Sequence, residues 1–352
     1  MRRRGGVGGE FAEAHGDPFE VFNLVDAAFD QIALTMDRLF GNARCLIGYR
    51  QYVETRCSAR LPGWAAPKRK SRRSKKMDEA DEINQHYERP SLVEHLRAAL
   101  AQSGLAEKRL STKDLAQLDQ FHSRGLAATM ELAKALQITE ATRVVDIGSG
   151  LGGPSRYLAE TFGCTVQGID LSQSFVDAAT FLAERSGLED KVVYQHGNAL
   201  ALPFSDDAFD VAWTQHVAMN IADRAALYGE TFRVLRRGGH FAMFDVLAAS
   251  EGPLHYPVPW ARGPETSFLV TAGEMRTVLE SQGLRIVSWT DCTEAGVSWF
   301  LEREAERARS SAPPLLALGT IMGPEFAQAG INLRRNLSEG RAVLIQAICE
   351  KV

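Results

Sequence analysis

The 352-residue sequence predicts an α/β fold in which helices cover both faces of a doubly wound, seven-stranded, mostly parallel sheet. Three observations predict it. Short apolar runs alternate with longer amphipathic stretches from about residue 142 onward, a glycine-rich turn at 146–153 follows the first run, and polar residues end the next three runs. Hydrophobic residues make up 45% of the chain, which is enough for a sizeable core.

Each strand is expected at an apolar run, and each helix in an amphipathic stretch between two runs. The expected strands are 143–147, 165–170, 192–196, 210–215, 239–246, 284–290 and 342–349. The expected helices between them are 154–162, 172–186, 222–235 and 271–282, the last with a capping box formed by Thr271 and Glu274.

Three parts of the chain are expected from these patterns. Residues 1–76 form a basic N-terminal extension, and 77–140 form a helical lid with helices at 78–102 and 111–136. The sheet domain occupies 141–352, with substrate-loop insertions expected near 247–270 and 293–338.

The net charge of −4 hides an asymmetry between the extension and the rest. Residues 1–76 hold 15 Lys and Arg against 8 Asp and Glu, a net charge of +7, and the remainder holds 25 against 36, a net charge of −11. An acidic main body fits a small-molecule enzyme and argues against a dedicated nucleic-acid binder. Within the extension, 17–40 has the periodicity of an amphipathic helix and 68–76 is a basic linker. Met77 follows that linker directly, so translation from Met77 is an equally good interpretation.

The cysteines and apolar runs indicate the compartment. Cys45, Cys57, Cys164, Cys292 and Cys349 contain no C-x-x-C pair, so neither a metal site nor a disulfide framework is expected. No apolar run reaches the roughly 20 residues that span a bilayer, and none follows the first arginines as in a secretory signal. We expect a cytoplasmic monomer or homodimer with no membrane or nucleic-acid partner.

The glycine-rich turn is the central motif. Gly148, Gly150 and Gly152 permit positive φ and close approach of a ligand to the backbone. The turn also satisfies the dinucleotide pattern G-x-G-x-x-G, so by itself it does not choose a ligand. Asp146 favours a different ligand, because a carboxylate there would repel a pyrophosphate but can bind the amino group of an amino-acid moiety.

Polar residues follow the next strands at the edge where open α/β sheets bind ligands. Asp170 can accept hydrogen bonds from two ribose hydroxyls, as it also would in a dinucleotide enzyme. Asn198 can bind an adenine amino group beside apolar neighbours, and Gln215 and His216 end the fourth strand.

Taken in order, these segments resemble the motifs of class I S-adenosylmethionine-dependent methyltransferases. The segments are DIGSGLGG, GIDLS, GNALALPF, DDAFDVAW and LRRGGHF, within about 143–246. Further segments resemble bacterial sarcosine/dimethylglycine N-methyltransferase-type proteins over about 80–352: DQFH at 119–122, TQH at 214–216, YPVPWA at 256–261 and NLSEGR at 336–341. Asn198 departs from the family, which usually has Asp there.

The resemblance implies a Rossmann-like methyltransferase fold and S-adenosyl-L-methionine as cofactor. It implies cofactor contacts from Asp146, Gly148, Ser149, Gly150, Gly152, Asp170, Leu171, Asn198, Ala199 and Gln215. It also implies a small-molecule methyl acceptor, the amine of a methylated glycine.

Methyl transfer is an in-line displacement, so the enzyme supplies alignment and excludes water. His122 and His216 are the candidate catalytic residues, because an imidazole can orient or deprotonate an acceptor. Tyr87, Tyr256 and Trp260 are candidates to cover the sulfonium or the acceptor, and Arg124 and Arg262 are candidates to bind an acceptor carboxylate. For each, a structural role is the alternative.

Three other functions stay open at this stage. The acceptor can be an oxygen or carbon of a quinone-like or natural-product molecule, since one fold serves many acceptors. An NAD-dependent oxidoreductase is less favoured because of Asp146. A non-catalytic binding protein that retains the fold is the last alternative.

Overall fold

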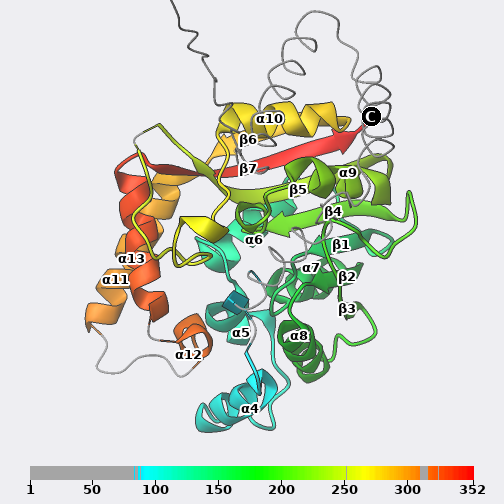
Figure 1. Cartoon of the computed structure of the whole chain (residues 1–352). Helices are drawn as coiled ribbons and strands as arrows, with labels where there is room; N and C mark the ends of the chain where they lie inside the picture. Colours follow the sequence, from blue (N-terminus) through cyan, green and yellow to red (C-terminus); the bar gives the residue numbers. More distant parts are fainter. Residues whose placement is uncertain (1–82, 84–85, 88, 251, 310–315, 324) are drawn as a thin grey trace, which may run out of the picture. The chain divides into compact units, whose positions relative to one another are not determined.

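A computed structural model of the chain describes residues 83, 86–87, 89–250, 252–309, 316–323 and 325–352 (Figure 1). The predicted helix at 17–40, the basic run at 68–76 and Met77 lie outside the described residues. The strands are β1 (Arg143–Ile147), β2 (Thr165–Asp170), β3 (Val192–His196), β4 (Phe209–Gln215), β5 (Leu235–Ala248), β6 (Leu284–Asp291) and β7 (Ala342–Lys351). The helices are α4 (Leu92–Gln102), α5 (Thr112–Asp119), α6 (Gly125–Lys134), α7 (Gly153–Phe162), α8 (Gln173–Ser186), α9 (Arg224–Val234), α10 (Ala272–Ser281), α11 (Thr293–Arg309), α12 (Leu318–Met322) and α13 (Glu325–Ser338).

The seven strands form one sheet in the order β3-β2-β1-β4-β5-β7-β6. The pairs among β1 to β5 are parallel, and β7 runs antiparallel to both β5 and β6. This confirms the predicted seven-stranded, mostly parallel sheet. The strand order reverses between β1 and β4, which is where an open α/β sheet forms a ligand-binding crevice at its carboxyl edge.

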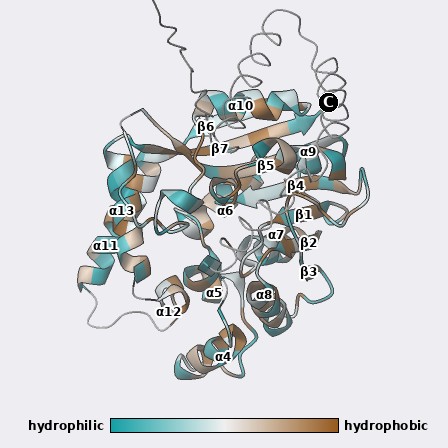
Figure 2. Cartoon of the chain, in the orientation of Figure 1, coloured by the Kyte–Doolittle hydropathy of each residue, from teal (hydrophilic) through white to brown (hydrophobic). Residues whose placement is uncertain are grey.

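Two hydrophobic cores lie on the two faces of the sheet. On one face, strand residues pack with apolar side chains of α6, α7, α8, α11 and α13. On the other face they pack with α9 and α10. Figure 2 shows hydrophobic colour along the strands and mixed colour on the helices around them, as expected for helices that bury one side only.

Local signals in the sequence place the helix ends. Thr271 and Glu274 form the predicted capping box at the start of α10. Ser172 caps α8 with its side chain, and Gly163 and Gly187 end α7 and α8 in the left-handed conformation. The predicted strands and helices of the sheet domain therefore agree with the structure to within a few residues at each end.

The segment ahead of the sheet differs from its prediction. The helix expected at 111–136 is two helices, α5 and α6. Ser111 caps α5 at the predicted start, and Arg124 at φ 66° and Gly125 at φ 50° interrupt the predicted helix. Of the helix expected at 78–102, α4 begins after Ser91 at φ 60° and ends at the predicted residue, and residues 83, 86 and 87 are also helical, while 78–82, 84–85 and 88 lie outside the described residues. Helical periodicity alone does not predict the left-handed residues at these breaks. The insertion predicted as a loop near 293–338 is also largely helical, since it holds α11, α12 and α13.

A buried ion pair joins the segment ahead of the sheet to the glycine-rich turn. The guanidinium of Arg156 in α7 donates to Asp119 Oδ2 at the end of α5 over 2.7 Å, and both side chains are almost fully buried. Arg156 also donates to the carbonyl of Leu151, within the turn itself, over 2.7 Å. The pair thus fixes the position of α5 against the turn.

Replacing Asp119 with Ala should lower the free energy of unfolding by about 3–5 kcal/mol, because Arg156 would keep a buried charge without its counter-ion. Urea denaturation measures the change. Arg262→Ala is the control, since its pair with Glu325 is 79% and 74% exposed, and its stability should differ little from the parent. Equal effects of the two variants would contradict a special role for the buried pair.

Candidate functional site

A cavity opens at the carboxyl ends of β1 to β4, where the strand order reverses. It extends over about 1250 Å³, including its open mouth. It reaches from the glycine-rich turn at Gly148 and Gly150 to Trp260 and Phe326.

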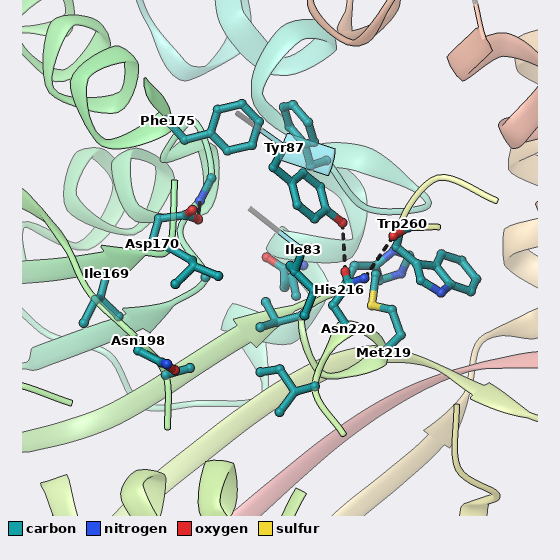
Figure 3. Close-up of a pocket in the computed structure, with 18 of the residues that line it drawn as sticks. Ile83, Tyr87, Ile169, Asp170, Phe175, Asn198, His216, Met219, Asn220 and Trp260 are labelled. Atoms are coloured by element: carbon teal, nitrogen blue, oxygen red, sulfur yellow. Dashed lines mark hydrogen bonds between the residues drawn. The ribbon is translucent and has the colours of Figure 1, made fainter. Parts of the chain in front are cut away.

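Most of the predicted cofactor residues lie in the wall of this cavity. Figure 3 shows Ile169, Asp170 and Asn198 on one side, and Met219, Asn220 and Trp260 on the other. We call these sides the cofactor end and the acceptor end. The predicted residues that line the cavity are Gly148, Gly150, Asp170, Leu171, Asn198, Ala199, Gln215 and His216.

The glycine-rich turn provides open backbone at the cofactor end. Gly148 has a φ of 76°, and a Cβ there would lie 2.6 Å from Val217. Gly150 has a φ of 53°, and a Cβ there would meet no atom within 4 Å. Because Gly150 lines the cavity, that open space is available for close approach of a ligand to the backbone.

Asp170 is oriented by the backbone. Its carboxylate accepts from the Gly150 amide over 2.8 Å and from the Ser172 amide over 2.9 Å. Burial raises the pKa of Asp170, and these two hydrogen bonds oppose the rise. Each oxygen keeps a further lone pair, so the carboxylate can still accept from the two hydroxyls of a ribose.

Asn198 is oriented in a way that the sequence did not indicate. Its Oδ1 accepts from the Leu200 amide over 2.8 Å, which fixes the plane of the side-chain amide. The amide NH2 group then remains as a donor at the cavity wall, suited to a ring nitrogen acceptor. Together with Gly150 and Asp170, this chemistry fits an adenosine group, so these three residues could hold S-adenosylmethionine.

His216 lies where β4 ends, with its backbone in the left-handed region at a φ of 55°. Its amide donates to the Phe244 carbonyl over 2.8 Å, and its ring contacts the Phe244 ring at a centroid distance of 5.0 Å. Burial holds the pKa of His216 well below its usual range, and the nearby His122 adds to this. The imidazole is therefore neutral at ordinary pH and can accept a proton or a hydrogen bond.

Three predicted cofactor residues do not line the cavity, namely Asp146, Ser149 and Gly152. Asp146 accepts from Ser155 Oγ over 2.5 Å and is 2% exposed, so its carboxylate is part of the buried support of the turn. Gly152 has a φ of 73°, and a Cβ there would collide with Tyr194. The glycine at 152 is thus explained by packing, and cofactor contacts from these three residues stay predictions.

His122 also lies behind the cavity wall. It is 5% exposed, and its Nδ1 lies 3.1 Å from the Ser123 carbonyl while its Nε2 lies 3.0 Å from Gln120 Oε1. Burial lowers the pKa of His122 to about 4. The structure thus brings His216 to the cavity and leaves His122 in contact with buried polar side chains.

The predicted carboxylate-binding arginines are absent from the described cavity wall. Arg124 donates to Glu131 over 2.6 Å, and Arg262 is exposed and paired with Glu325. Tyr256 packs against the core rather than lining the cavity, whereas Tyr87 and Trp260 line it as predicted.

The wall of the acceptor end contains residues that the sequence did not single out. Asn220 accepts from Tyr87 Oη over 2.8 Å and donates to the carbonyls of Trp260 and Thr266 over 2.9 and 3.1 Å. It therefore joins three segments that are far apart in the chain. Apolar residues of the cavity wall also come from separate segments, among them Ile83, Phe121, Met219, Ile221, Trp260 and Phe326. These six come from five parts of the chain, so no local motif reveals them.

The described residues contain no group of three or more His, Cys, Asp or Glu side chains suited to a metal ion. Among the helices described, none is long and apolar enough to cross a membrane.

Residues 145–243 match the family model described as a methyltransferase domain. A curated relative, methyltransferase GfsG of Streptomyces halstedii, is 28% identical over 224 residues, which cover 62% of this chain and 75% of that protein. Glycine/sarcosine/dimethylglycine N-methyltransferase of Actinopolyspora halophila is 31% identical over 163 residues, 46% of this chain and 29% of that protein. For the next six relatives, among them sterol 24-C-methyltransferases and a probable tocopherol O-methyltransferase, the match covers between 26% and 51% of each protein.

The fold is also found among solved structures. Geranyl diphosphate C-methyltransferase from Streptomyces coelicolor A3(2) aligns with a TM-score of 0.57 at 18% identity, over 81% of this chain and all of that chain.

Gly150→Ala should weaken binding of S-adenosylhomocysteine by about tenfold or more, because the added methyl group enters the cofactor end of the cavity. Gly238→Ala is a matched control: its φ is 70°, a Cβ there meets no atom within 4 Å, and it does not line the cavity. Calorimetry should find its affinity unchanged. Similar losses in both variants would assign the effect to backbone strain.

Asp146→Asn should change how stability depends on pH. Burial raises the pKa of Asp146 to about 7, opposed by the Ser155 hydrogen bond and reinforced by the charge of Asp170. The folded state therefore binds a proton that the unfolded state releases above about pH 4, so this group lowers the free energy of unfolding as the pH rises from about 4 to 7. An asparagine side chain does not titrate, so the variant should not lose free energy of unfolding in this way. Its free energy of unfolding relative to that of the parent should therefore rise between about pH 4 and 7. Urea denaturation at pH 5 and 7.5 measures the difference, and a parallel pH dependence would contradict the raised pKa.

Proposed function

We propose that the methyl acceptor of this chain, which carries a class I S-adenosylmethionine-dependent methyltransferase domain, is a small molecule with a largely apolar skeleton. The observation that carries the proposal is the acceptor end of the cavity. Met219 and Trp260 lie at this end beside Asn220 (Figure 3). Further aliphatic and aromatic residues of the cavity wall come from the segment ahead of the sheet and from α13, and Asp223 also lines the cavity. Such a wall favours an apolar ligand, because binding removes apolar surface of both from water.

The cofactor, when bound, supplies a methyl group on a sulfonium, which is transferred by in-line displacement. The chain aligns the two molecules: Gly150, Asp170 and Asn198 bind the adenosine part, and the acceptor end holds the nucleophile against the methyl group. His216 lies between the two ends, and its neutral imidazole accepts a proton or hydrogen bond from the acceptor. The surrounding apolar side chains exclude water, which strengthens the polar contacts inside.

A methylated glycine amine is the second candidate. One observation favours it: a match at 31% identity to a relative named for glycine, sarcosine and dimethylglycine. Tyr87 and Trp260 also line the cavity and can stabilise a cationic nitrogen. However, the two arginines expected to bind a carboxylate, Arg124 and Arg262, have acidic partners outside the cavity wall. An apolar acceptor matches more of the residues that line the cavity than a methylated glycine does.

Incubation with methyl-labelled S-adenosylmethionine and single candidate acceptors separates the two. We expect label transfer to a hydroxylated aromatic acceptor such as 1-naphthol or 1,4-dihydroxynaphthalene, and none to sarcosine or dimethylglycine, with mass spectrometry identifying the product. Gly150→Ala serves as the control, because its weakened cofactor site should reduce all transfer. Turnover of a methylated glycine with no transfer to the aromatic compounds would overturn the apolar acceptor in favour of the amine.

A further inference from the structure

A cluster of buried polar side chains lies behind the cavity wall and contacts Gln215, which lines the cavity. Trp213 and Gln215 lie two residues apart on β4, and the indole Nε1 of Trp213 donates to Gln215 Oε1 over 2.9 Å. Trp213 is fully buried. An indole nitrogen can only donate, so the contact identifies the oxygen of the Gln215 amide and fixes its orientation.

Thr129 of α6 is fully buried, and its Oγ1 lies 3.0 Å from Gln215 Oε1. The same Oγ1 lies 2.8 Å from Gln120 Oε1 and 3.1 Å from His122 Nε2. A hydroxyl has one hydrogen to donate, so Thr129 can donate to only one of these three atoms. The Trp213 indole is therefore the donor that fixes the Gln215 oxygen, and the amide cannot turn over without losing that hydrogen bond.

The nitrogen of the same amide has no such partner. Gln215 is 8% exposed and lines the cavity, yet its Nε2 is buried with no hydrogen-bond partner among the described residues. Buried amide groups are normally hydrogen-bonded, and a buried donor without a partner destabilises a protein. Because Gln215 lines the cavity, a ligand oxygen that reaches this amide would supply the missing acceptor atom.

The residues around the Gln215 amide determine which kind of ligand atom it can bind. The next residue is His216, whose neutral ring also has an unpartnered nitrogen. An N–H donor in an apolar compartment repels a cationic nitrogen and attracts an oxygen lone pair.

We propose that the Gln215 amide is the specificity-determining donor for the methyl acceptor, and that it binds a hydroxyl or carbonyl oxygen on the acceptor's apolar skeleton. Trp213 is a positioning residue, which acts by donating a hydrogen bond to the amide oxygen. This assignment rests on the proposed function, which supplies the apolar acceptor. It differs from the cofactor contact that family resemblance implies for Gln215. Measuring acceptor binding and S-adenosylhomocysteine binding separately distinguishes the two roles.

The test measures binding of two probes to the protein loaded with S-adenosylhomocysteine. The probes are 1-naphthol and 1-methylnaphthalene, which have similar shapes but differ in one oxygen. The parent protein should bind 1-naphthol about tenfold more tightly, as expected for one net hydrogen bond. Gln215→Met keeps a side chain of similar length but removes the amide donor, so it should abolish the preference. Gln215→Leu should do the same, and the affinity for S-adenosylhomocysteine should stay within about twofold in both.

Trp213→Phe tests the positioning role. Without the indole donor the amide can rotate, so the preference for 1-naphthol should fall while S-adenosylhomocysteine binding persists. A thermal midpoint measured on each variant separates this from loss of folding: a purely structural Trp213 would lower the midpoint and leave the preference unchanged, which contradicts positioning.

The remaining outcomes each overturn one proposal. A preference that survives both Gln215 variants, or a tenfold loss of S-adenosylhomocysteine affinity in them, overturns the assignment of Gln215 and leaves the apolar acceptor in place. If the loaded parent protein binds neither naphthalene compound, the apolar acceptor fails, and the assignment fails with it.

Discussion

The reversal of strand order between β1 and β4 is the constraint from which the site follows. Because the helices after these two strands leave toward opposite faces of the sheet, a space opens at their carboxyl ends that no helix fills. The glycine-rich turn enters this space from β1, and Gln215 and His216 enter it from β4. Asp170 links the turn to β2 by accepting from the Gly150 amide, so the cofactor end is held together before a ligand arrives.

Burial controls the charges around this space. It raises the pKa values of Asp146 and Asp170 and lowers those of His122 and His216, so both kinds of side chain shift toward their neutral forms. A neutral environment suits a cofactor that brings its own positive charge and loses it during transfer. Polar groups at the acceptor end include the Asn220 amide and the Tyr87 hydroxyl, which are uncharged, hydrogen-bonded to each other and close to Met219 and Trp260.

The buried support of the site extends well beyond the wall. The ion pair between Asp119 and Arg156 holds α5 against the turn, and one residue later Gln120 contacts the Thr129 hydroxyl, which lies 3.0 Å from Gln215 Oε1. The segment ahead of the sheet thus contributes to the support of the cavity wall. His122 lies in the same cluster, 3.1 Å from the Thr129 hydroxyl, and its predicted action on the substrate stays a prediction.

The sequence by itself determined the sheet, the helices of the sheet domain and most of the cofactor end. These features are local: each strand and its following turn are contiguous, so the positions of Gly150, Asp170 and Asn198 follow from strand boundaries and parallel topology. Only the tertiary structure decided the surroundings of the polar residues in the wall, because many of their partners come from distant segments. Tyr87 and Trp260 contact Asn220 in this way, and Phe244 contacts His216. The acceptor end was the least predictable, since Ile83 and Phe326 are brought into one wall from opposite ends of the described chain. Periodicity predicts that such residues are buried, but not against which ligand, because that depends on packing between elements far apart in sequence.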